Sequence, residues 1–495
     1  MTPGPGIRTL AERVTGHAER APASTAMRWL GEDVTYADLT RLVDRHRRRL
    51  TMLGIRAGHP VAAVAPVAPD TVALILACHR IGAPVLLPSG ELPAETLSAL
   101  LRQAGCRHQV VADGDEVTVV PSAEPVTDPS AAVPADTPFL LTTSGSTGVP
   151  KVVPVSGRAI HRFAGWAGGR FGIGPGTRVL SYAPLNFDLS LLDVWTTLHR
   201  GGCVVPVARN DATDGRRLLD LLARERPEIV QAVPMFYQLL VAARPRLPLP
   251  SVRHVLYSGD AAPARLLAEL PRLLPRAAIS SVYGCTEIND AFVYQIPPGR
   301  PAPDPVPLGE PVPGVEWLLA DDHGRPVDGP GSGELWVRTP FQTSGYLDAA
   351  RTSERFAVPV AGVPHEPFFR TGDVVRRCTD GALHLQGRID FHVKVRGVQV
   401  NLQAVERVLL ECPGVAEAVV VALDDPVAGK RLHAVVRTAG GAPAGEMALR
   451  RHCAGQLART SVPSRFHLVT TPLPRTGSGK PDRIATARVH LGATP

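Results

Sequence analysis

Short apolar runs alternate with amphipathic helical segments through the first 290 residues, and this alternation constrains the fold more than any other feature. Residues 60–69 and 138–143 are apolar runs typical of strands, whereas residues 70–82 and 215–226 have helical periodicity. Strands that alternate with helices favour parallel sheets covered by helices on both faces. We therefore expect an α/β fold whose large N-terminal domain contains two doubly wound sheets.

The pattern changes in the second half of the chain. Beyond Arg300, short strands alternate with turn dipeptides, which predicts a small β-rich subdomain. From Phe391 onward the pattern is compact and α+β. We expect an N-terminal core over residues 1–386, a boundary at residues 387–390 ("GRID") and a small C-terminal α+β domain over residues 391–495.

The composition excludes several classes of protein. The seven cysteines lack metal-ligand spacing, so we predict no disulfide framework and a reducing, cytoplasmic compartment. No signal peptide is visible, and prolines and charges interrupt the most apolar stretch (residues 61–88), which predicts no membrane span. The net charge of +7 is suited to steering polyanions such as nucleotides, coenzyme A or an acidic carrier protein, but arginine bias alone is the favoured explanation. The sequence has no basic block with interleaved aromatic residues, so we predict no nucleic-acid binding.

Three polar loops follow three predicted strands. They are "TTSGSTG" (142–148), "YSGD" (257–260) and "YGCTE" (283–287). In open α/β sheets, ligands bind outside the carboxyl ends of the strands. We therefore expect the three loops to converge on one crevice.

The first loop has the composition of a phosphate cradle. Its glycines permit close backbone approach, and Lys151 adds a positive charge to the hydroxyl and amide donors of Thr143, Ser144, Ser146 and Thr147. It is not a Walker P-loop, because Pro150 precedes the lysine and Val152 follows it. Taken alone, such a loop is equally compatible with a flexible surface turn.

Lysine is rare in this chain. Only four of the 53 basic residues are lysines, namely Lys151, Lys394, Lys430 and Lys480. A lysine in an arginine-rich chain marks a place where a compact point charge serves better than a planar fork of donors. Chance is sufficient to explain Lys430.

Six motifs together resemble one family. "TSGSTGVPK" resembles the phosphate-loop signature of the adenylate-forming superfamily, which includes acyl-CoA synthetases, amino-acid adenylation domains and related ligases. The family's other motifs follow in order as "YGCTE", "GELWVRTPFQTSGYLDAARTSERF", "FFRTGDVV", "GRIDFHVKVRGVQVNLQAVE" and "PRTGSGKPDR". The resemblance covers essentially the whole chain, which is therefore identified as a member of this superfamily.

The resemblance implies ATP and Mg²⁺ as cofactors. Tyr283 would stack on adenine, Glu287 would hold the Mg²⁺ that bridges the phosphates, and Asp373 would bond both ribose hydroxyls with Arg388 nearby. The other implied nucleotide contacts are Thr142, Thr143, Ser144, Gly145, Ser146, Thr147, Gly148, Lys151, Gly259, Asp260, Gly284 and the catalytic Thr286.

The resemblance also assigns roles in the C-terminal domain. Lys480 would bridge the substrate carboxylate and the α-phosphate as the carboxylate attacks phosphorus in line. Lys394 lies in the segment that resembles the face used in the second half-reaction, where Gly397 would let a pantetheine arm pass. Asp390 resembles the hinge about which this mobile domain swings.

The substrate is indicated by "NFDLSLLDVW", which resembles the "FD-x-S" segment of amino-acid adenylation domains. Asp188 occupies the position that pairs with the substrate ammonium, and a buried ammonium needs such a partner. The alternative is that Asp188 caps a helix over residues 188–195.

The other implied pocket residues are mostly small or aliphatic. Asp290 differs from them: if it faces the pocket, it favours a hydroxyl or a second amine on the substrate, and if it faces away, it leaves a small apolar amino acid. The set comprises Phe187, Leu189, Leu192, Ala232, Leu256, Ser258, Val282, Asp290 and Ala291.

Two residues depart from the pattern of amino-acid-activating relatives. Cys285 stands where they usually have proline, and Ser281 where they often have asparagine. Both loosen the assignment to the peptide-synthetase branch.

The fate of the adenylate follows from the end of the sequence. No carrier module follows Lys480, so we expect a stand-alone enzyme. We expect it to transfer an amino acid to the phosphopantetheine thiol of a separate carrier protein, or to coenzyme A. Such a transfer is typical of nonribosomal peptide and antibiotic biosynthesis. The alternatives are an acyl- or aryl-CoA synthetase and a catalytically silent nucleotide-binding scaffold; retention of Lys480, Glu287 and Asp373 argues against the scaffold.

Overall fold

A computed structural model of the chain describes residues 8–90, 92–113, 116–121, 133–143, 150–244, 247–358, 367–395, 398–425, 429–438, 445–475 and 481–493. The chain forms two compact units, Met1–Trp317 with Val337–Phe369 and Leu318–Trp336 with Arg370–Pro495. The predicted boundary and hinge at residues 387–390 stay a prediction.

The larger unit contains a nine-stranded sheet. Its six central strands are parallel, and antiparallel strands close both edges. The strands are, in spatial order, β15 (Glu310–Pro311), β14 (Asn289–Gln295), β13 (Ala278–Cys285), β12 (His254–Ser258), β11 (Ile229–Ala232), β9 (Arg178–Ser181), β10 (Cys203–Pro206), β1 (Thr25–Trp29) and β2 (Glu32–Thr35).

A six-stranded sheet lies in the same unit. Its four central strands are parallel, and each edge is an antiparallel hairpin. The order is β6 (Glu116–Pro121), β5 (His108–Asp113), β3 (Val61–Ala63), β4 (Val85–Leu86), β7 (Phe139–Thr143) and β8 (Lys151–Val155). Strand β3 is shorter than the apolar run at 60–69 predicts, because Pro66 and Pro69 cannot donate to a ladder.

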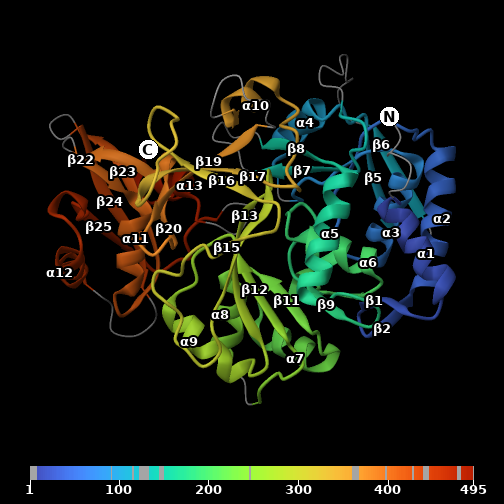
Figure 1. The fold of residues 1–495 in the computed structure, drawn as a ribbon, viewed down its shortest axis with the longest axis horizontal. Coiled ribbons are helices and arrows are strands. Elements are labelled where there is room, and N and C mark those ends of the chain that lie inside the picture. The colour runs from blue at the N-terminus through green and yellow to red at the C-terminus, as the bar shows by residue number, and fades with distance from the viewer. Residues whose placement is uncertain are drawn as a thin grey trace. The chain divides into compact units, whose positions relative to one another are not determined.

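Helices connect these strands. In Figure 1, α1, α2 and α3 lie side by side, and α7, α8 and α9 lie next to one another beside β11 and β12. The helices of this unit are α1 (Leu10–Arg20), α2 (Tyr36–Met52), α3 (Pro69–Ile81), α4 (Ala94–Gln103), α5 (Gly157–Phe171), α6 (Thr197–Arg200), α7 (Gly215–Glu225), α8 (Pro234–Ala242), α9 (Ala264–Leu273) and α10 (Ala349–Arg355), with a π-helical turn η1 (Leu191–Thr196) and a 3₁₀ turn η2 (Arg209–Asp211).

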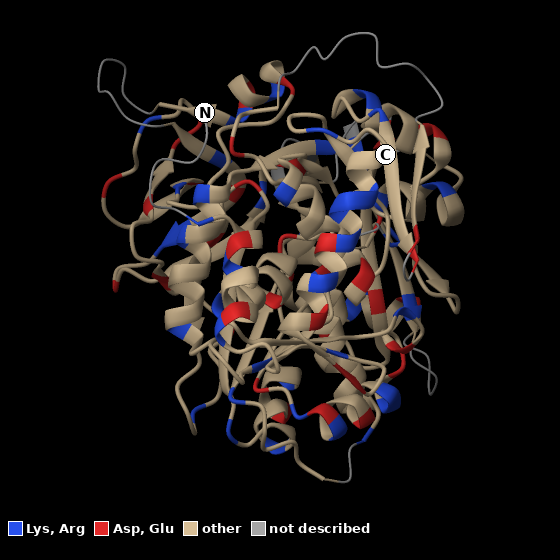
Figure 2. Ribbon diagram, turned by 90° about the vertical axis from the view of Figure 1, so that its right-hand side faces the viewer, with Lys and Arg blue, Asp and Glu red and all other residues tan. Residues whose placement is uncertain are grey.

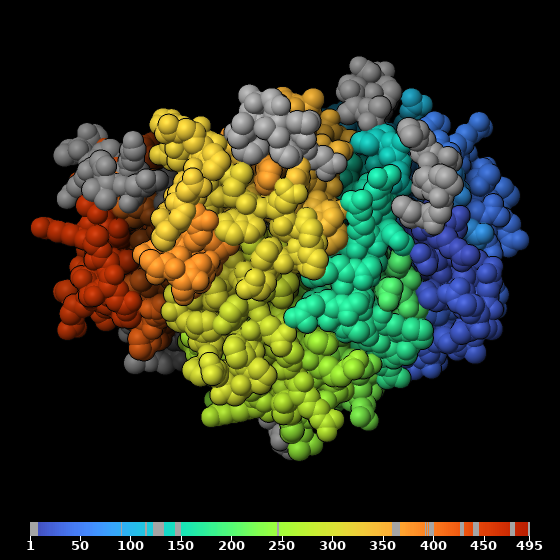
Figure 3. All heavy atoms as spheres, viewed as in Figure 1, coloured from blue at the N-terminus to red at the C-terminus, as the bar shows by residue number. Residues whose placement is uncertain are grey.

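Local sequence signals determine where several helices begin. Thr9 and Glu12 form a capping box at α1, and Thr35 and Asp38 form one at α2. A connected apolar core then joins α1, α3, α5 and η1, and Trp195 packs against Phe139 with ring centroids 4.9 Å apart. In Figure 3, the teal atoms of α5 and the strands beside it meet the blue N-terminal residues.

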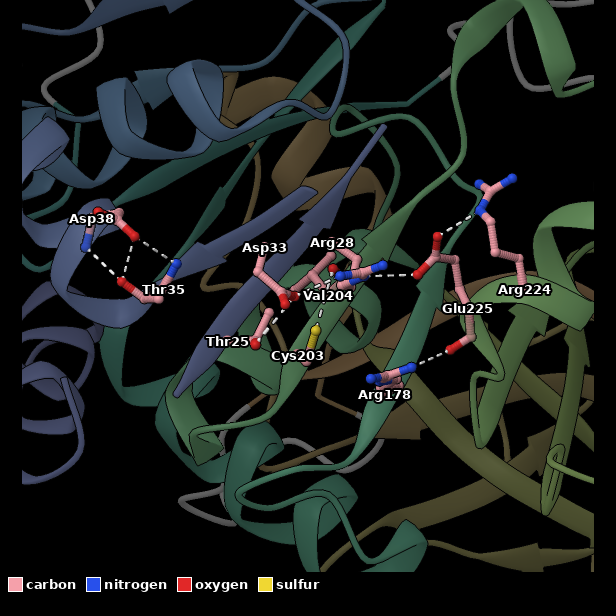
Figure 4. Close-up of polar contacts among 10 residues, drawn as sticks. All are labelled: Thr25, Arg28, Asp33, Thr35, Asp38, Arg178, Cys203, Val204, Arg224 and Glu225. Atoms are coloured by element: carbon pink, nitrogen blue, oxygen red, sulfur yellow. Dashed lines mark hydrogen bonds and ion pairs between the residues drawn. The ribbon is translucent and has the colours of Figure 1, made fainter. Parts of the chain in front are cut away.

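Arg28 links the edge of the nine-stranded sheet to the end of α7. Its guanidinium lies 2.9 Å from Asp33 Oδ1 and 2.8 Å from Glu225 Oε2 (Figure 4). Burial opposes ionisation of Glu225, but the guanidinium groups of Arg224 and Arg28 outweigh it and lower the pKa of this carboxyl. The pair joins segments almost 200 residues apart in sequence and so holds β1 in the sheet.

The remaining sheets are small. A five-stranded sheet has the order β16 (Glu316–Ala320), β17 (Gly331–Arg338), β19 (Phe368–Arg377) and β18 (Phe356–Ala357), with β20 (Leu383–Arg388) paired to β19. In the smaller unit, β21 (His392–Val395) pairs with β22 (Val398–Asn401), and β23 (Val415–Asp425), β24 (Gly429–Thr438) and β25 (Arg465–Val469) form a three-stranded sheet. Its helical elements are η3 (Ile389–Phe391), α11 (Leu402–Glu411), α12 (Glu446–Gln456), η4 (Arg459–Ser461) and α13 (Arg483–Leu491).

The predicted fold class is confirmed: two doubly wound sheets, a small β-rich region and a small α+β domain are all present. None of the seven cysteines forms a disulfide bond. Within the described residues, none of the helices has the length and hydropathy needed to cross a membrane. Basic and acidic residues are intermixed along the drawn elements (Figure 2), which agrees with attributing the net charge to arginine bias.

Candidate functional site

The carboxyl ends of the central strands lie together at one edge of the nine-stranded sheet. Gln231 pairs with Ser181, Ala232 with Tyr257, and Ser258 with Val282, so β9, β11 and β12 end within a residue of one another, and β13 continues three residues further to Cys285. This edge is where the sequence predicts a crevice.

The predicted phosphate loop connects an antiparallel hairpin. Thr143 at the end of β7 pairs with Lys151 at the start of β8, and Thr142 pairs with Val152. The loop residues Ser144, Gly145, Ser146, Thr147 and Gly148 lie outside the described residues. The pairing of β7 with β8 is antiparallel because the connection is too short for a parallel crossover, whereas β7 pairs in parallel with β4 on its other side. The hydroxyl oxygen of Thr143 is buried and has no hydrogen-bond partner among the described residues.

The Tyr346 side chain contacts both Lys151 and Glu287. Lys151 Nζ lies 5.1 Å from the centre of the Tyr346 ring. The Tyr346 hydroxyl donates to Glu287 Oε1 over 2.6 Å. Burial, together with the adjacent Glu287 carboxylate, raises the pKa of Tyr346, so the phenol stays a hydrogen-bond donor. Glu287 is therefore held in one orientation next to the cationic end of β8.

Residues from Tyr283 to Asp290 come from a single hairpin of β13 and β14. Gly284 pairs with Asp290, and a Cβ at Gly284 would lie 2.2 Å from the Asn289 carbonyl oxygen, so this close approach requires glycine. The turn between the strands carries Thr286 and Glu287. The Tyr283 ring packs against Phe292 with centroids 6.0 Å apart.

Asp188 is bound to this hairpin. The Thr286 hydroxyl donates to Asp188 Oδ2 over 3.1 Å, which joins the predicted ammonium partner to the predicted catalytic threonine. The following helical turn, η1, begins at Leu191 with Ser190 at the N-cap position. Phe187 lies beside Asp188 and is partly exposed. π-helical turns of this kind are frequent at functional sites.

Asp290 lies near Asp188, and Asp193 lies near Asp290. Asp290 is 8% exposed and Asp193, on η1, is fully buried, and the Oδ2 atom of each lacks a hydrogen-bond partner among the described residues. Burial, assisted by the charge of Asp188, raises the pKa of Asp290 to about 8. Burial also raises the pKa of Asp193 well above its ordinary value. Gln231, oriented with its amide nitrogen toward these groups, donates to Asp193 Oδ1 over 3.0 Å.

The apolar residues of the predicted pocket surround this polar group. They come from η1, β11, β12, β13 and β14, and their burial indicates rigid walls. Leu192, Ala232, Leu256 and Ala291 are fully buried, Val282 and Ser258 are nearly so, and Leu189 is partly exposed.

The "YSGD" loop follows β12 directly. Gly259 has a φ of +82°, a left-handed conformation that favours glycine. Asp260 is exposed, and its Oδ1 accepts a hydrogen bond from the Ala261 amide over 2.8 Å.

In the smaller unit, Asp373 and Arg388 are direct partners across β19 and β20. Their side chains form an ion pair of 3.1 Å, and Arg388 also lies 3.3 Å from Asp390. Glu334 holds the turn before Asp373, because its carboxylate accepts from the Gly372 amide over 3.1 Å.

The structure describes only part of the two functional lysines predicted in the smaller unit. The backbone of Lys394 pairs with Gln399 in the β21–β22 hairpin, whereas its side chain and all of Lys480 and Gly397 lie outside the described residues. The segment leading to Lys480 is anchored: Glu417 binds Arg475 and accepts from the Leu473 amide over 2.9 Å.

Sequence reasoning missed Tyr346, Glu334, Asp193 and Glu417. Tyr346 and Glu334 lie inside a motif that carries the family resemblance, but their roles depend on contacts between distant segments. Asp193 could have been predicted from the sequence. It lies within the apolar run "LSLLDVW", which favours its burial, and a buried carboxylate usually has a specific partner.

Family models and known proteins match most of the chain. The family model of AMP-binding enzymes matches residues 14–347, and the model of the AMP-binding enzyme C-terminal domain matches residues 404–480. Phosphinothricin tripeptide synthetase PhsC of Streptomyces viridochromogenes is 32% identical, over 97% of this chain and 45% of its own length. An L-prolyl-carrier protein ligase of Streptomyces coelicolor is 30% identical, over 92% of this chain and 91% of its own length.

A solved structure of an enzyme with a related sequence has a similar fold. The amide bond synthetase McbA of Marinactinospora thermotolerans has 27% sequence identity and a TM-score of 0.80, with 98% of this chain and 99% of that chain covered. The chain spans less than half the length of the tripeptide synthetase and nearly all of the ligase and of McbA.

Proposed function

The chain belongs to the AMP-binding enzyme family, and on that premise we propose that it uses ATP to convert an amino acid into its acyl adenylate. In a second step, the aminoacyl group passes to the phosphopantetheine thiol of a separate carrier protein. We propose that both steps occur in the cytoplasm.

The contact between Asp188 and Thr286 carries the amino-acid assignment. The Asp188 carboxylate accepts a hydrogen bond from the Thr286 hydroxyl, and Ser190 holds the N-cap position of the next helical turn. This geometry supports a ligand-binding carboxylate more than a helix cap. An ammonium ion entering a partly buried pocket needs such a charge to stay ionised.

The β7–β8 hairpin and Glu287 support binding of nucleotide phosphates. The Thr143 hydroxyl, which has no hydrogen-bond partner among the described residues, is a donor suited to a phosphate oxygen, and Lys151 adds positive charge beside it. Among the described residues, no group of three or more His, Cys, Asp or Glu side chains is arranged to hold a metal. One carboxylate, Glu287, still fits Mg²⁺, which is commonly held by one or two carboxylates together with substrate phosphates.

The chemistry is in-line displacement at the α-phosphorus of ATP. The substrate carboxylate attacks phosphorus and pyrophosphate leaves, and Lys480 is proposed to neutralise the charge that develops. Bound Mg²⁺ would draw charge from the phosphate oxygens. Tyr346 keeps Glu287 oriented, Asp373 is proposed to bind the ribose hydroxyls, and Asp188 is proposed to hold the substrate by its ammonium group.

Amino-acid-dependent exchange of labelled pyrophosphate into ATP tests the proposal. The panel contains proteinogenic, β- and diamino acids, with fatty and aryl acids as amine-free comparisons. We expect exchange with an amino acid, and we expect Lys480→Ala to abolish it while the melting temperature stays the same.

Asp188→Asn tests the ammonium contact. We expect its KM for the amino acid to rise about 10- to 100-fold with little change in the KM for ATP. Asp220→Asn, on the exposed face of α7, is the matched control. Exchange with amine-free acids alone would overturn the proposal, and so would an equal effect of Asp188→Asn on all acids.

A further inference from the structure

One oxygen of the buried Asp290 carboxyl, Oδ2, lacks a hydrogen-bond partner among the described residues. Asp290 lies on β14, four residues beyond the threonine that binds Asp188, and is 92% buried. A buried polar atom without a partner is costly, and such atoms in native proteins usually await a ligand, a water molecule or an ion.

The surroundings of Asp290 are acidic. The Asp188 carboxylate is near enough to raise the pKa of Asp290, and Asp290 in turn raises the pKa of Asp193. No ion pair formed by the described residues includes Asp290 or Asp193. One ammonium group on a substrate would neutralise Asp188 and leave the carboxyl of Asp290 unmatched.

Asp193 is already supplied with donors. The Gln231 amide and backbone N–H groups near Tyr182 and Ala183 reach its carboxyl, although Oδ2 has no partner. At Asp290, by contrast, no donor among the described residues reaches Oδ2, and the carboxyl groups of Asp188 and Asp193 lie near enough to interact with it electrostatically. Asp290 is therefore the member of this group that fits a donor on the substrate.

We propose that the amino acid activated by this chain is a diamino acid, whose second ammonium group is bound by Asp290 while its first is bound by Asp188. This inference rests on the proposed function and specifies its substrate class. Without a ligand, burial and the charge of Asp188 keep Asp290 protonated below about pH 8. A second ammonium group would stabilise the ionised form of Asp290 beside Asp188, whereas a hydroxyl group would satisfy Oδ2 without offsetting that charge, so the electrostatics favour an amine.

Pyrophosphate exchange with matched pairs of substrates tests the proposal. Each diamino acid (2,3-diaminopropionate, 2,4-diaminobutyrate, ornithine and lysine) is compared with the amino acid that has a methyl group in place of the second amine and with the one that has a hydroxyl. We expect the best diamino acid to exceed both analogues by at least about 100-fold in kcat/KM, because the analogues leave a buried carboxyl unmatched.

Asp290→Asn keeps the shape of the side chain and removes its charge. We expect the preference for the diamino acid over its methyl analogue to fall to within about tenfold in this variant, while the KM for ATP is maintained. Asp220→Asn is again the control and should keep the wild-type preference. Thermal unfolding confirms that both variants are folded before the comparison is made.

The outcomes separate this inference from the proposed function. Exchange with a mono-amino acid that is equal to or faster than exchange with every diamino acid overturns the inference and leaves the proposed function intact. A hydroxy amino acid preferred over its diamino counterpart also overturns it, as does an unchanged preference in Asp290→Asn. Absence of exchange with any amino acid overturns the proposed function itself.

Discussion

Replacing Asp290 by asparagine is expected to stabilise the folded chain, and the gain is expected to grow with pH. The unfolded chain has an Asp290 carboxyl with an ordinary pKa of 3.8, whereas burial raises the pKa of the folded group to about 8. Between these values the folded state binds one more proton than the unfolded state, so the stability of the wild type falls as pH rises. Asparagine cannot ionise in either state and removes this dependence.

The magnitude follows from the shift. Each pH unit inside the window changes the free energy of unfolding by about 1.4 kcal/mol, so the difference between variant and wild type should grow by about 4 kcal/mol from pH 5 to pH 8. Above pH 8 the folded carboxyl ionises as well, and the difference should level off.

Urea unfolding at pH 5, 6, 7, 8 and 9, without nucleotide or amino acid, measures this difference. The relevant transition is that of the larger unit, which contains Asp290. Asp220→Asn makes the same chemical change on the exposed face of α7, and its effect should stay within about 0.5 kcal/mol. A difference between variant and wild type that stays constant from pH 5 to pH 8 would refute the reasoning, because Asp290 would then be ionised when folded.

Two further predictions concern residues that position the site. Tyr346→Phe removes the hydrogen bond to Glu287, so the Mg²⁺ concentration for half-maximal pyrophosphate exchange should rise about tenfold; an unchanged Mg²⁺ titration would contradict the orienting role. In Glu417, burial is outweighed by the Leu473 amide and by the guanidinium groups of Arg475 and Arg437, which lower its pKa below 4.5. Its stabilisation is present above pH 4.5 and lost as pH falls through the lowered pKa. Glu417→Gln should therefore lower the melting temperature at pH 7 and slow exchange, and equal melting temperatures at pH 7 would exclude this role.

Sequence alone was sufficient for the fold class and the family, because both depend on local patterns. Alternating strands and helices predicted the doubly wound sheets, and six motifs in order identified the adenylate-forming family, which the family models confirm. The convergence of the loops after β12 and β13 also followed from a general rule about parallel sheets. The assigned site roles remain predictions.

Contacts between distant segments required the tertiary structure. The hydrogen bond from Thr286 to Asp188 joins residues 98 positions apart, and Tyr346 reaches Glu287 across 59. The sequence left open whether Asp290 faces the pocket, because a period-two strand pattern does not report which groups lie across from a side chain. Burial and a neighbouring carboxylate raise the pKa of Asp290, and both depend on the packing of β14 against other elements. Local patterns therefore determined which chemistry-bearing residues the chain carries, whereas only the tertiary structure decided which of them meet, since proximity and burial are properties of the packed chain.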